Sequence, residues 1–360
     1  RNPDVAHIIT GGELLAGKYS SAYKRVKNDS EVYAVVKKFE YITDKPTVYT
    51  MFIYDRQEEK YKVLTRKDVE TLSENHSYEY INDVIDGYDV GDIIEKDTIV
   101  YRSTSYDEHG NYGYGMNALT MFTFDPYTHE DAAVVRRGFA EKMTSIKTDI
   151  VDVMINNNEV LCNLYGEDGE YTPLPGLGEK VSGILIAKRK IFDAQALNEL
   201  TDEALNEINF LGGDECYFTS GEVVDIDIFC NNPELAEIDF NSDMIKYINA
   251  QKQYYTEIES TCREIRESGK DYSKEITYIH KRAKEFLDEE SKWTPGDNIF
   301  DNVVIRLTVK RIEPLRIGQK ITGRHGNKCV ISDIRDDDVM PILETGEPVD
   351  LLINTCGVVN

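Results

Sequence analysis

Residues 316–332, which read R-I-G-Q-K-I-T-G-R-H-G-N-K-C-V-I-S, decide how the chain is interpreted. They predict a strand that enters a loop bounded by Gly323 and Gly326 and leaves as a second strand, and the two glycines let the backbone approach a ligand closely. The segment presents four basic or titratable side chains: Lys320, Arg324, His325 and Lys328. Lysines act as point charges for phosphate oxygens. The G-x-x-x-x-G-K-[ST] spacing of a Walker loop is absent, so these residues indicate either a phosphate-binding hairpin or a solvated basic loop.

The charge around this segment is unusual for the chain. The formal net charge is −25, which excludes unspecific coating of nucleic acid by a basic surface. Residues 301–330, however, hold seven Lys or Arg residues against two Asp or Glu residues. A local basic segment in an acidic protein favours a small polyanionic target, such as a phosphate chain held at one place.

Length and composition set broad limits. The 360 residues are enough for two or three domains, and 41% hydrophobic with 30% charged residues is typical of a globular protein. No apolar run approaches the roughly 18–20 residues that span a bilayer, so we expect no membrane segment. Six scattered cysteines without a C-x-x-C pair predict reduced thiols and a cytoplasmic location. The chain opens at Arg1 without an initiator Met, so we expect it to be part of something longer.

Periodicity predicts a β-rich α+β fold. Six segments have the β-branched and aromatic enrichment of strands: 32–36, 47–54, 118–124, 181–187, 223–229 and 303–309. Apolar residues recur at helical spacing within 242–266 and again within 276–287. Gly269-Lys270-Asp271 separates these two stretches, which predicts an antiparallel helical hairpin at about 242–290.

The lysine segment resembles the signature of the β subunit of bacterial-type multisubunit RNA polymerases, G-(D/Q)-K-x-x-G-R-H-G-N-K-G. The resemblance continues through Met340-Pro341, Gly346-Glu347-Pro348-Val349-Asp350, Asn354 and Gly357-Val358. Upstream, residues 127–132 are similar to the family's Y-N-F-E-D-(A/S), residues 91–94 to its G-D-(I/V)-(I/L), and residues 183–188 more weakly to G-D-I-L-V-G-K. The blocks occur in family order and cover most of the chain.

The resemblance implies roles for six residues. Lys320 would approach the RNA 3′ end or the initiating nucleotide, and Lys328 would reach the adjacent phosphates. Arg324 and His325 would contact the substrates, although His325 can equally support the loop. Glu130 and Asp131 match an acidic pair beside the incoming nucleotide, where Asp131 would help position a second Mg²⁺ through water. A carboxylate suits this oxygen-liganded cation.

The resemblance also implies the architecture. It predicts a double-psi β-barrel assembled from separated segments, the first at 91–150 with the Glu-Asp motif and the second at 301–360 with the lysine loop. Residues 1–90 would form a β-rich region upstream of the barrel. Residues 151–300 would form a flap-like insertion that carries the helical hairpin.

The resemblance also implies partners. The family's primary Mg²⁺ ligands are three aspartates in N-A-D-F-D-G-D on the β′ subunit, and no such run occurs here. The chain is therefore expected to act only in a multisubunit complex. Its expected partners are a β′-like subunit, the other part of β if that subunit is split, a promoter-specificity factor, template DNA, RNA and nucleoside triphosphates.

Departures from the pattern leave alternatives open. Cys329 stands where the family has Gly, and the chain stops at Asn360, just before the family's arginine that approaches the nucleotide. Such divergence resembles the split β subunits of giant-bacteriophage polymerases, acting in the host cytoplasm or carried in the virion; a divergent cellular or plasmid enzyme is the other origin. A non-catalytic nucleic-acid-binding or scaffold subunit that retains a polymerase-like barrel is the alternative function. A hydrolase using Glu130 and Asp131 as a dyad is disfavoured, because adjacent carboxylates on a strand point to opposite faces.

Overall fold

The structure is a computed structural model, and all structural statements below concern the residues that it describes. These are 23–43, 45–73, 76–81, 85–104, 106–111, 115–166, 170–190, 215–238, 241–288, 300–323 and 326–357. The chain is rich in strands with few helices, which confirms the predicted β-rich α+β class.

The N-terminal part of the chain is built around an antiparallel meander. Its strands are β2 (Ser30–Lys38), β3 (Val48–Asp55) and β4 (Lys60–Lys67), and the short strands β7 (Ile93–Ile94) and β15 (Asp271–Tyr272) complete the order β15-β4-β3-β2-β7. A neighbouring sheet has the order β1-β8-β6-β5; its strands are β1 (Tyr23–Arg25), β5 (Val69–Ser73), β6 (His76–Ile81) and β8 (Ile99–Ser103). A short 3-10 turn, η2 (Ile85–Gly87), lies between β6 and β7. The predicted strands at 32–36 and 47–54 are thus confirmed.

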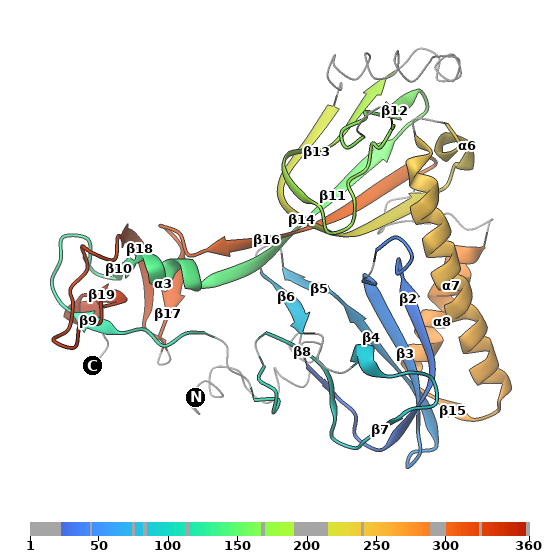
Figure 1. Ribbon diagram of the computed structural model, residues 1–360, viewed down its shortest axis with the longest axis horizontal. Coiled ribbons are helices and arrows are strands. Elements are labelled where there is room, and N and C mark those ends of the chain that lie inside the picture. The colour runs from blue at the N-terminus through green and yellow to red at the C-terminus, as the bar shows by residue number, and fades with distance from the viewer. Residues whose placement is uncertain are drawn as a thin grey trace.

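The predicted helical hairpin is also confirmed. Helix α7 (Asp243–Glu267) and helix α8 (Lys274–Leu287) cover one side of the N-terminal meander (Figure 1). Their apolar face meets Val36, Phe52 and Tyr61 of the sheet in one buried cluster; the helix residues in it are Ile258, Cys262, Ile265, Ile276 and Ala283. Burying an apolar side chain of this size contributes roughly 1.5–3 kcal/mol, so the hairpin is attached to the N-terminal sheet. Among the described helices, none is long and apolar enough to cross a bilayer.

A third sheet lies above the meander in Figure 1 and contains the longest of the described strands. Its order is β11-β16-β14-β13-β12, with β11 (Thr144–Ile155), β12 (Glu159–Leu161), β13 (Lys180–Lys190), β14 (Glu215–Cys230) and β16 (Val303–Pro314). The short helix α6 (Pro233–Ala236) and the first turns of α7 pack on it, where Met244, Tyr247 and Ala250 join its core. The predicted strands at 181–187, 223–229 and 303–309 lie within this sheet.

The C-terminal sheet lies at the far end of the long β11–β16 ribbon (Figure 1). Its order is β17-β18-β10-β19-β9, with β9 (Thr120–Phe122), β10 (Ala132–Arg136), β17 (Lys320–Thr322), β18 (Lys328–Arg335) and β19 (Leu351–Ile353). Helix α3 (Arg137–Lys142) follows β10, and the 3-10 turn η4 (Thr355–Gly357) follows β19. The strand predicted at 118–124 is shorter than expected. The described strands do not close into a barrel, so the double-psi barrel and the flap stay predictions.

The end of β3 carries a carboxylate, Asp55, whose ionisation makes the stability of the chain depend on pH. The buried Asp55 carboxylate accepts hydrogen bonds from the Glu58 amide (2.9 Å), from Asn28 and from the Lys62 ammonium (2.7 Å). Burial alone would raise the pKa of Asp55, but these donors lower it to about 2.

We expect Asp55→Asn to lower the free energy of unfolding by about 2 kcal/mol at pH 7, because a depressed carboxyl pKa stabilises the folded state only above the unfolded-state pKa near 4. That contribution is lost as the pH falls from about 4 towards 2. Urea titrations of wild type and variant between pH 7 and pH 3 measure the difference. A difference that stays constant down to pH 3 would contradict this explanation.

Candidate functional site

The candidate site is centred on the hairpin formed by β17 and β18, which we call the lysine hairpin. Lys320 lies opposite Val330, and Thr322 lies opposite Lys328. Side chains alternate between the faces of a strand, so Lys320 and Lys328 project from the same face as diagonal neighbours, roughly 7–8 Å apart at their Cβ atoms. Both side chains are exposed. Two ammonium groups at this spacing can contact neighbouring phosphates of one ligand.

The opposite face of the lysine hairpin is buried. Ile321 and Cys329 point into a core cluster with Ala133 and Ile331. Cys329, where the family pattern has Gly, is therefore an ordinary interior strand residue. Burial, and to a smaller extent the Asp131 carboxylate, raises the pKa of its thiol. The substitution is accommodated because the side chain points into the core, away from the lysine face.

The loop of the lysine hairpin is tight at its glycines. Gly323 donates its amide to the Asn327 carbonyl (2.9 Å), and a Cβ at Gly323 would lie 2.3 Å from the Asn327 side chain. Gly326 has a φ of +85°, which side chains rarely adopt. Glycine is therefore the residue that fits the backbone at both of these positions. Arg324 and His325 lie outside the described residues, so their substrate contacts stay predictions.

In the structure, part of the positive charge of the basic segment at 301–330 is neutralised by ion pairs. Its first four cations form ion pairs: Arg306 with Asp152, Lys310 with Glu79, Arg311 with Asp149 and Arg316 with Glu313. Lys320 and Lys328 have no carboxylate within ion-pair distance among the residues described. Three of these acids lie on other strands, and Glu313 lies three residues before Arg316. Among the cations of this segment that the structure describes, Lys320 and Lys328 are therefore the ones left available to an anionic ligand.

The acidic pair lies at the same end of the sheet. Strands β10 and β18 run parallel, with Ala132 opposite Val330, and the Asp131 carbonyl accepts the Val330 amide at 2.8 Å. Lys320, Val330 and Ala132 therefore form one row across three strands. Since neighbouring strands are about 4.8 Å apart, the Asp131 backbone lies roughly 10 Å from that of Lys320. Residues nearly 200 positions apart in sequence meet here.

The local conformation of the acidic pair differs from the expectation. Glu130 and Asp131 lie in a turn before β10, and both are exposed. Glu130 has a φ of +53°, in the left-handed region. The expectation that the two carboxylates alternate along a strand is wrong, because the Ala132 amide donates to the His129 carbonyl and closes a turn.

Two salt bridges that sequence reasoning missed brace this sheet. Arg335 donates to both oxygens of Asp125 at 2.9 Å, and Arg136 donates twice to Asp350 Oδ1, at 3.0 and 2.6 Å. Asp350 also accepts the Leu119 amide, which ties β9 to its neighbours. No spacing signal could have revealed these pairs, since each joins residues more than 200 positions apart. The aspartate of the G-x-P-V-D block is thereby explained as a structural residue.

The donor set for a metal ion is limited. Within the described part of the chain, no group of three His, Cys, Asp or Glu side chains converges to hold a metal. Asp131 is exposed and offers one carboxylate, which fits a contact to Mg²⁺ through water but would not hold the ion alone.

Similarity to known proteins includes the lysine hairpin. The sequence model of the family "RNA polymerase Rpb2, domain 6" matches residues 179–359, just over half of the chain. The chain is 25% identical to the "DNA-directed RNA polymerase subunit beta" of Mycoplasma capricolum over 75% of its length, and 23% identical to that of Staphylococcus epidermidis over 99%. It spans only 18% and 26% of the length of these relatives. By its family match, the chain belongs to the RNA polymerase Rpb2, domain 6 family.

Proposed function

We propose that the chain is a β-like subunit of a DNA-directed RNA polymerase. In this role it positions the RNA 3′ end and the nucleoside triphosphate for template-directed nucleotidyl transfer. The single observation that supports this most is the lysine hairpin, which presents two ammonium groups beside an acidic turn, with no ion-pair partner for either among the residues that the structure describes. Nucleotidyl transfer needs charge neutralisation and alignment more than covalent participation by the protein.

The proposed roles of the residues are those that the family resemblance implies. Lys320 holds the RNA 3′ end, and Lys328 neutralises the adjacent phosphates; Arg324 and His325 add contacts from the loop. Mg²⁺ held by a β′-like partner supplies activation of the 3′-OH and stabilisation of the leaving pyrophosphate. The exposed Asp131 carboxylate orients water towards such an ion, and Glu130 faces the incoming nucleotide.

The proposal includes an assembly. The matched part is only 18% and 26% of the length of the two curated relatives, so further polypeptide is needed to complete a polymerase. We propose a β′-like subunit with an aspartate triad, the remaining part of β, and a promoter-specificity factor as partners in the cytoplasm. A double-psi barrel completed in this assembly, a flap-like role for residues 151–300 and a giant-bacteriophage origin belong to the same proposal.

Purification of the tagged chain from its source, followed by mass spectrometry and a transcription assay, tests the proposal. We expect a complex that contains a polypeptide with an N-A-D-F-D-G-D run and that incorporates nucleotides only when template DNA is present. A stable complex that contains this polypeptide but does not extend a primed RNA would favour a scaffold role.

In that complex, Asp131→Asn is expected to raise the Mg²⁺ concentration for half-maximal nucleotide addition by about tenfold, because it removes a carboxylate that orients the water bound to the ion. Glu141→Gln, which removes the same charge from an exposed acid on α3, is the control and should leave the Mg²⁺ dependence unchanged. Equal Mg²⁺ curves for Asp131→Asn and wild type would remove Asp131 from the metal's surroundings.

A further inference from the structure

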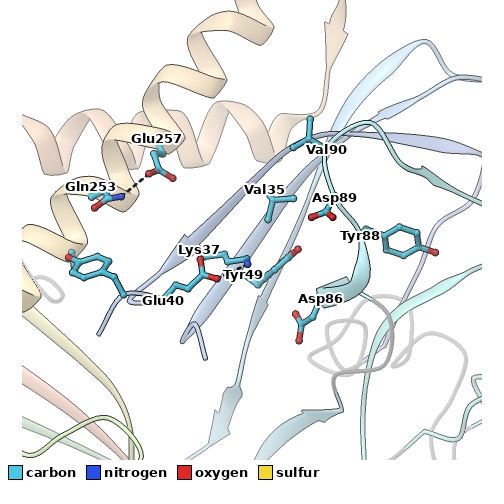
Figure 2. Close-up of a pocket in the computed structure, with 12 residues that line it drawn as sticks. Val35, Lys37, Glu40, Tyr49, Asp86, Tyr88, Asp89, Val90, Gln253 and Glu257 are labelled. Carbon is cyan, nitrogen blue, oxygen red and sulfur yellow. Dashed lines mark hydrogen bonds and ion pairs between the residues drawn. The ribbon is translucent and has the colours of Figure 1, made fainter. Parts of the chain in front are cut away.

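The groove in Figure 2 lies away from the lysine hairpin, between the N-terminal meander and α7, and has a volume of about 510 Å³. Its Lys37 ammonium pairs with Glu40 at 2.8 Å, and Gln253 donates to Glu257 at 3.1 Å. Asp89 lies on the opposite side of the groove from Glu257. These acids therefore do not gather at one point, whereas several polar contacts beside the lysine hairpin converge on one short segment.

That segment, residues 125–131, leads from β9 into β10 and ends in the acidic pair; we call it the acidic loop. Asp125 accepts the Tyr127 amide at its carboxylate and the Thr128 amide at its carbonyl, both at 2.9 Å. Thr128 is fully buried, and its hydroxyl accepts the Asp125 amide at 3.0 Å. These bonds close the first half of the acidic loop on itself, but they do not fix where the loop lies relative to the lysines.

Strand β18 supplies that fixation. Arg335 donates to both carboxylate oxygens of Asp125, each at 2.9 Å, and its guanidinium carbon lies 5.5 Å from the centre of the Tyr127 ring. The Ser332 hydroxyl lies within hydrogen-bond distance of the Tyr127 carbonyl and, at 3.0 Å, of the Ala133 carbonyl in β10. Two side chains of β18 thus hold the part of the acidic loop that precedes the acidic pair.

The same strand holds the other end of the acidic loop and one of the two lysines. It begins at Lys328, and the amide of Val330 donates to the Asp131 carbonyl at 2.8 Å. The pair of Arg335 and Asp125 suits this task, because a bidentate guanidinium–carboxylate contact has a fixed geometry and both side chains are about four-fifths buried. The Arg335 guanidinium lowers the pKa of Asp125, so the pair remains charged at neutral pH.

From these contacts we infer that Arg335 and Ser332 are positioning residues: they fix the acidic loop on β18 so that the Asp131 carboxylate stays beside the ligand bound by Lys328. Functional side chains keep a productive geometry only when their supports are themselves fixed by packing and hydrogen bonds. Neither positioning residue touches the substrates in this scheme, and both act through the backbone of the acidic loop. The inference rests on the proposed function, since it gives the loop geometry a purpose only if Asp131 acts near the metal.

Amide hydrogen exchange of the full chain, resolved by residue, tests the positioning without transcription. Arg335→Gln is expected to speed exchange of the Tyr127 amide by about tenfold or more, because the carboxylate that accepts this amide loses its guanidinium partner. Arg136→Gln is the matched control: it removes a similarly buried arginine of the same sheet, whose partner Asp350 accepts the Leu119 amide. This control should speed exchange at Leu119 and leave exchange at Tyr127 unchanged.

The Mg²⁺ dependence of nucleotide addition by the assembled complex tests the purpose of the positioning. Arg335→Gln is expected to raise the half-maximal Mg²⁺ concentration by about fivefold, and Ser332→Ala by about twofold. Both increases should disappear in an Asp131→Asn background, because a residue that acts through Asp131 has no further effect once that carboxylate is gone. Arg136→Gln should leave the Mg²⁺ dependence unchanged, so weakening of the sheet alone does not imitate the effect.

The outcomes separate this inference from the proposed function. Unchanged exchange of the Tyr127 amide in Arg335→Gln would overturn the inference, as would additive effects of Arg335→Gln and Asp131→Asn on the Mg²⁺ dependence. An equal rise in Arg136→Gln would also overturn it, by showing that any damage to the sheet has this effect. A Mg²⁺ shift for Asp131→Asn without one for Arg335→Gln contradicts the inference alone. If Asp131→Asn causes no shift, the role proposed for Asp131 is wrong and the inference fails with it.

Discussion

Nucleotide addition by the assembled polymerase is expected to slow by on the order of 100-fold when Lys320 or Lys328 is replaced by alanine, with assembly unchanged. A preorganised cation that neutralises charge in the transition state has an effect of this size when it is removed. Both side chains are exposed and make no ion pair within the described residues, so their removal leaves no buried acid unpaired. Single-turnover extension of a primed RNA by purified complexes measures the rate, and subunit stoichiometry measures assembly.

A matched control separates position from charge. Lys142 ends α3, the helix whose buried residues pack into the core behind the lysine hairpin. Lys142→Ala therefore makes the same change in charge on the other side of the sheet and is expected to leave the extension rate within about twofold of wild type. Normal extension by both Lys320→Ala and Lys328→Ala would refute the assignment of these residues. Loss of assembly in either variant would show a structural role instead.

The largest expected effect on stability is at Lys38, which joins two sheets. Its ammonium at the end of β2 lies 3.1 Å from Asp225 and 2.5 Å from Asp227, both on β14. Only 5% of the Lys38 side chain is exposed. Burial by itself lowers the pKa of Lys38, but the two carboxylates raise it far above its usual range. Lys38 is therefore a buried charge that compensates two partly buried aspartates.

We expect Lys38→Met to lower the free energy of unfolding by about 3–5 kcal/mol at pH 7, because it leaves two carboxylates uncompensated at a buried site. The loss should shrink as the aspartates take up protons with falling pH: Asp225 first, because its pKa is raised, and Asp227 only below its usual pKa of about 4, because its pKa is lowered. Lys37→Met is the control, since the neighbouring Lys37 forms a partly exposed pair with Glu40 and should cost less than about 1 kcal/mol.

Urea denaturation of the purified chain at pH 7 and near pH 4 measures these differences. Combining Lys38→Met with Asp225→Asn and Asp227→Asn should recover most of the lost stability, because no unpaired charge then remains. If Lys38→Met is no more destabilising than Lys37→Met, the buried pair does not hold the two sheets together.

Part of this architecture was predictable from local sequence. Period-two and helical patterns predicted β2, β3, β16 and the α7–α8 hairpin, because each pattern reflects which face of one element is buried. The lysine hairpin was predicted from its glycines. The acidic turn was predicted wrongly as a strand, since the left-handed conformation of Glu130 depends on how the chain enters β10.

The sequence by itself determined the element types, the chemistry of the lysine hairpin and the family to which the chain is related. Only the tertiary structure decided which charges remain available. It pairs Arg306, Lys310 and Arg311 with acids from distant parts of the sequence and leaves Lys320 and Lys328 beside Asp131. The physical reason is the separation along the sequence over which each kind of interaction acts. Backbone preferences and burial patterns depend on near neighbours in the chain, whereas an ion pair or a parallel strand contact joins residues whose separation of more than 100 positions leaves no local signal.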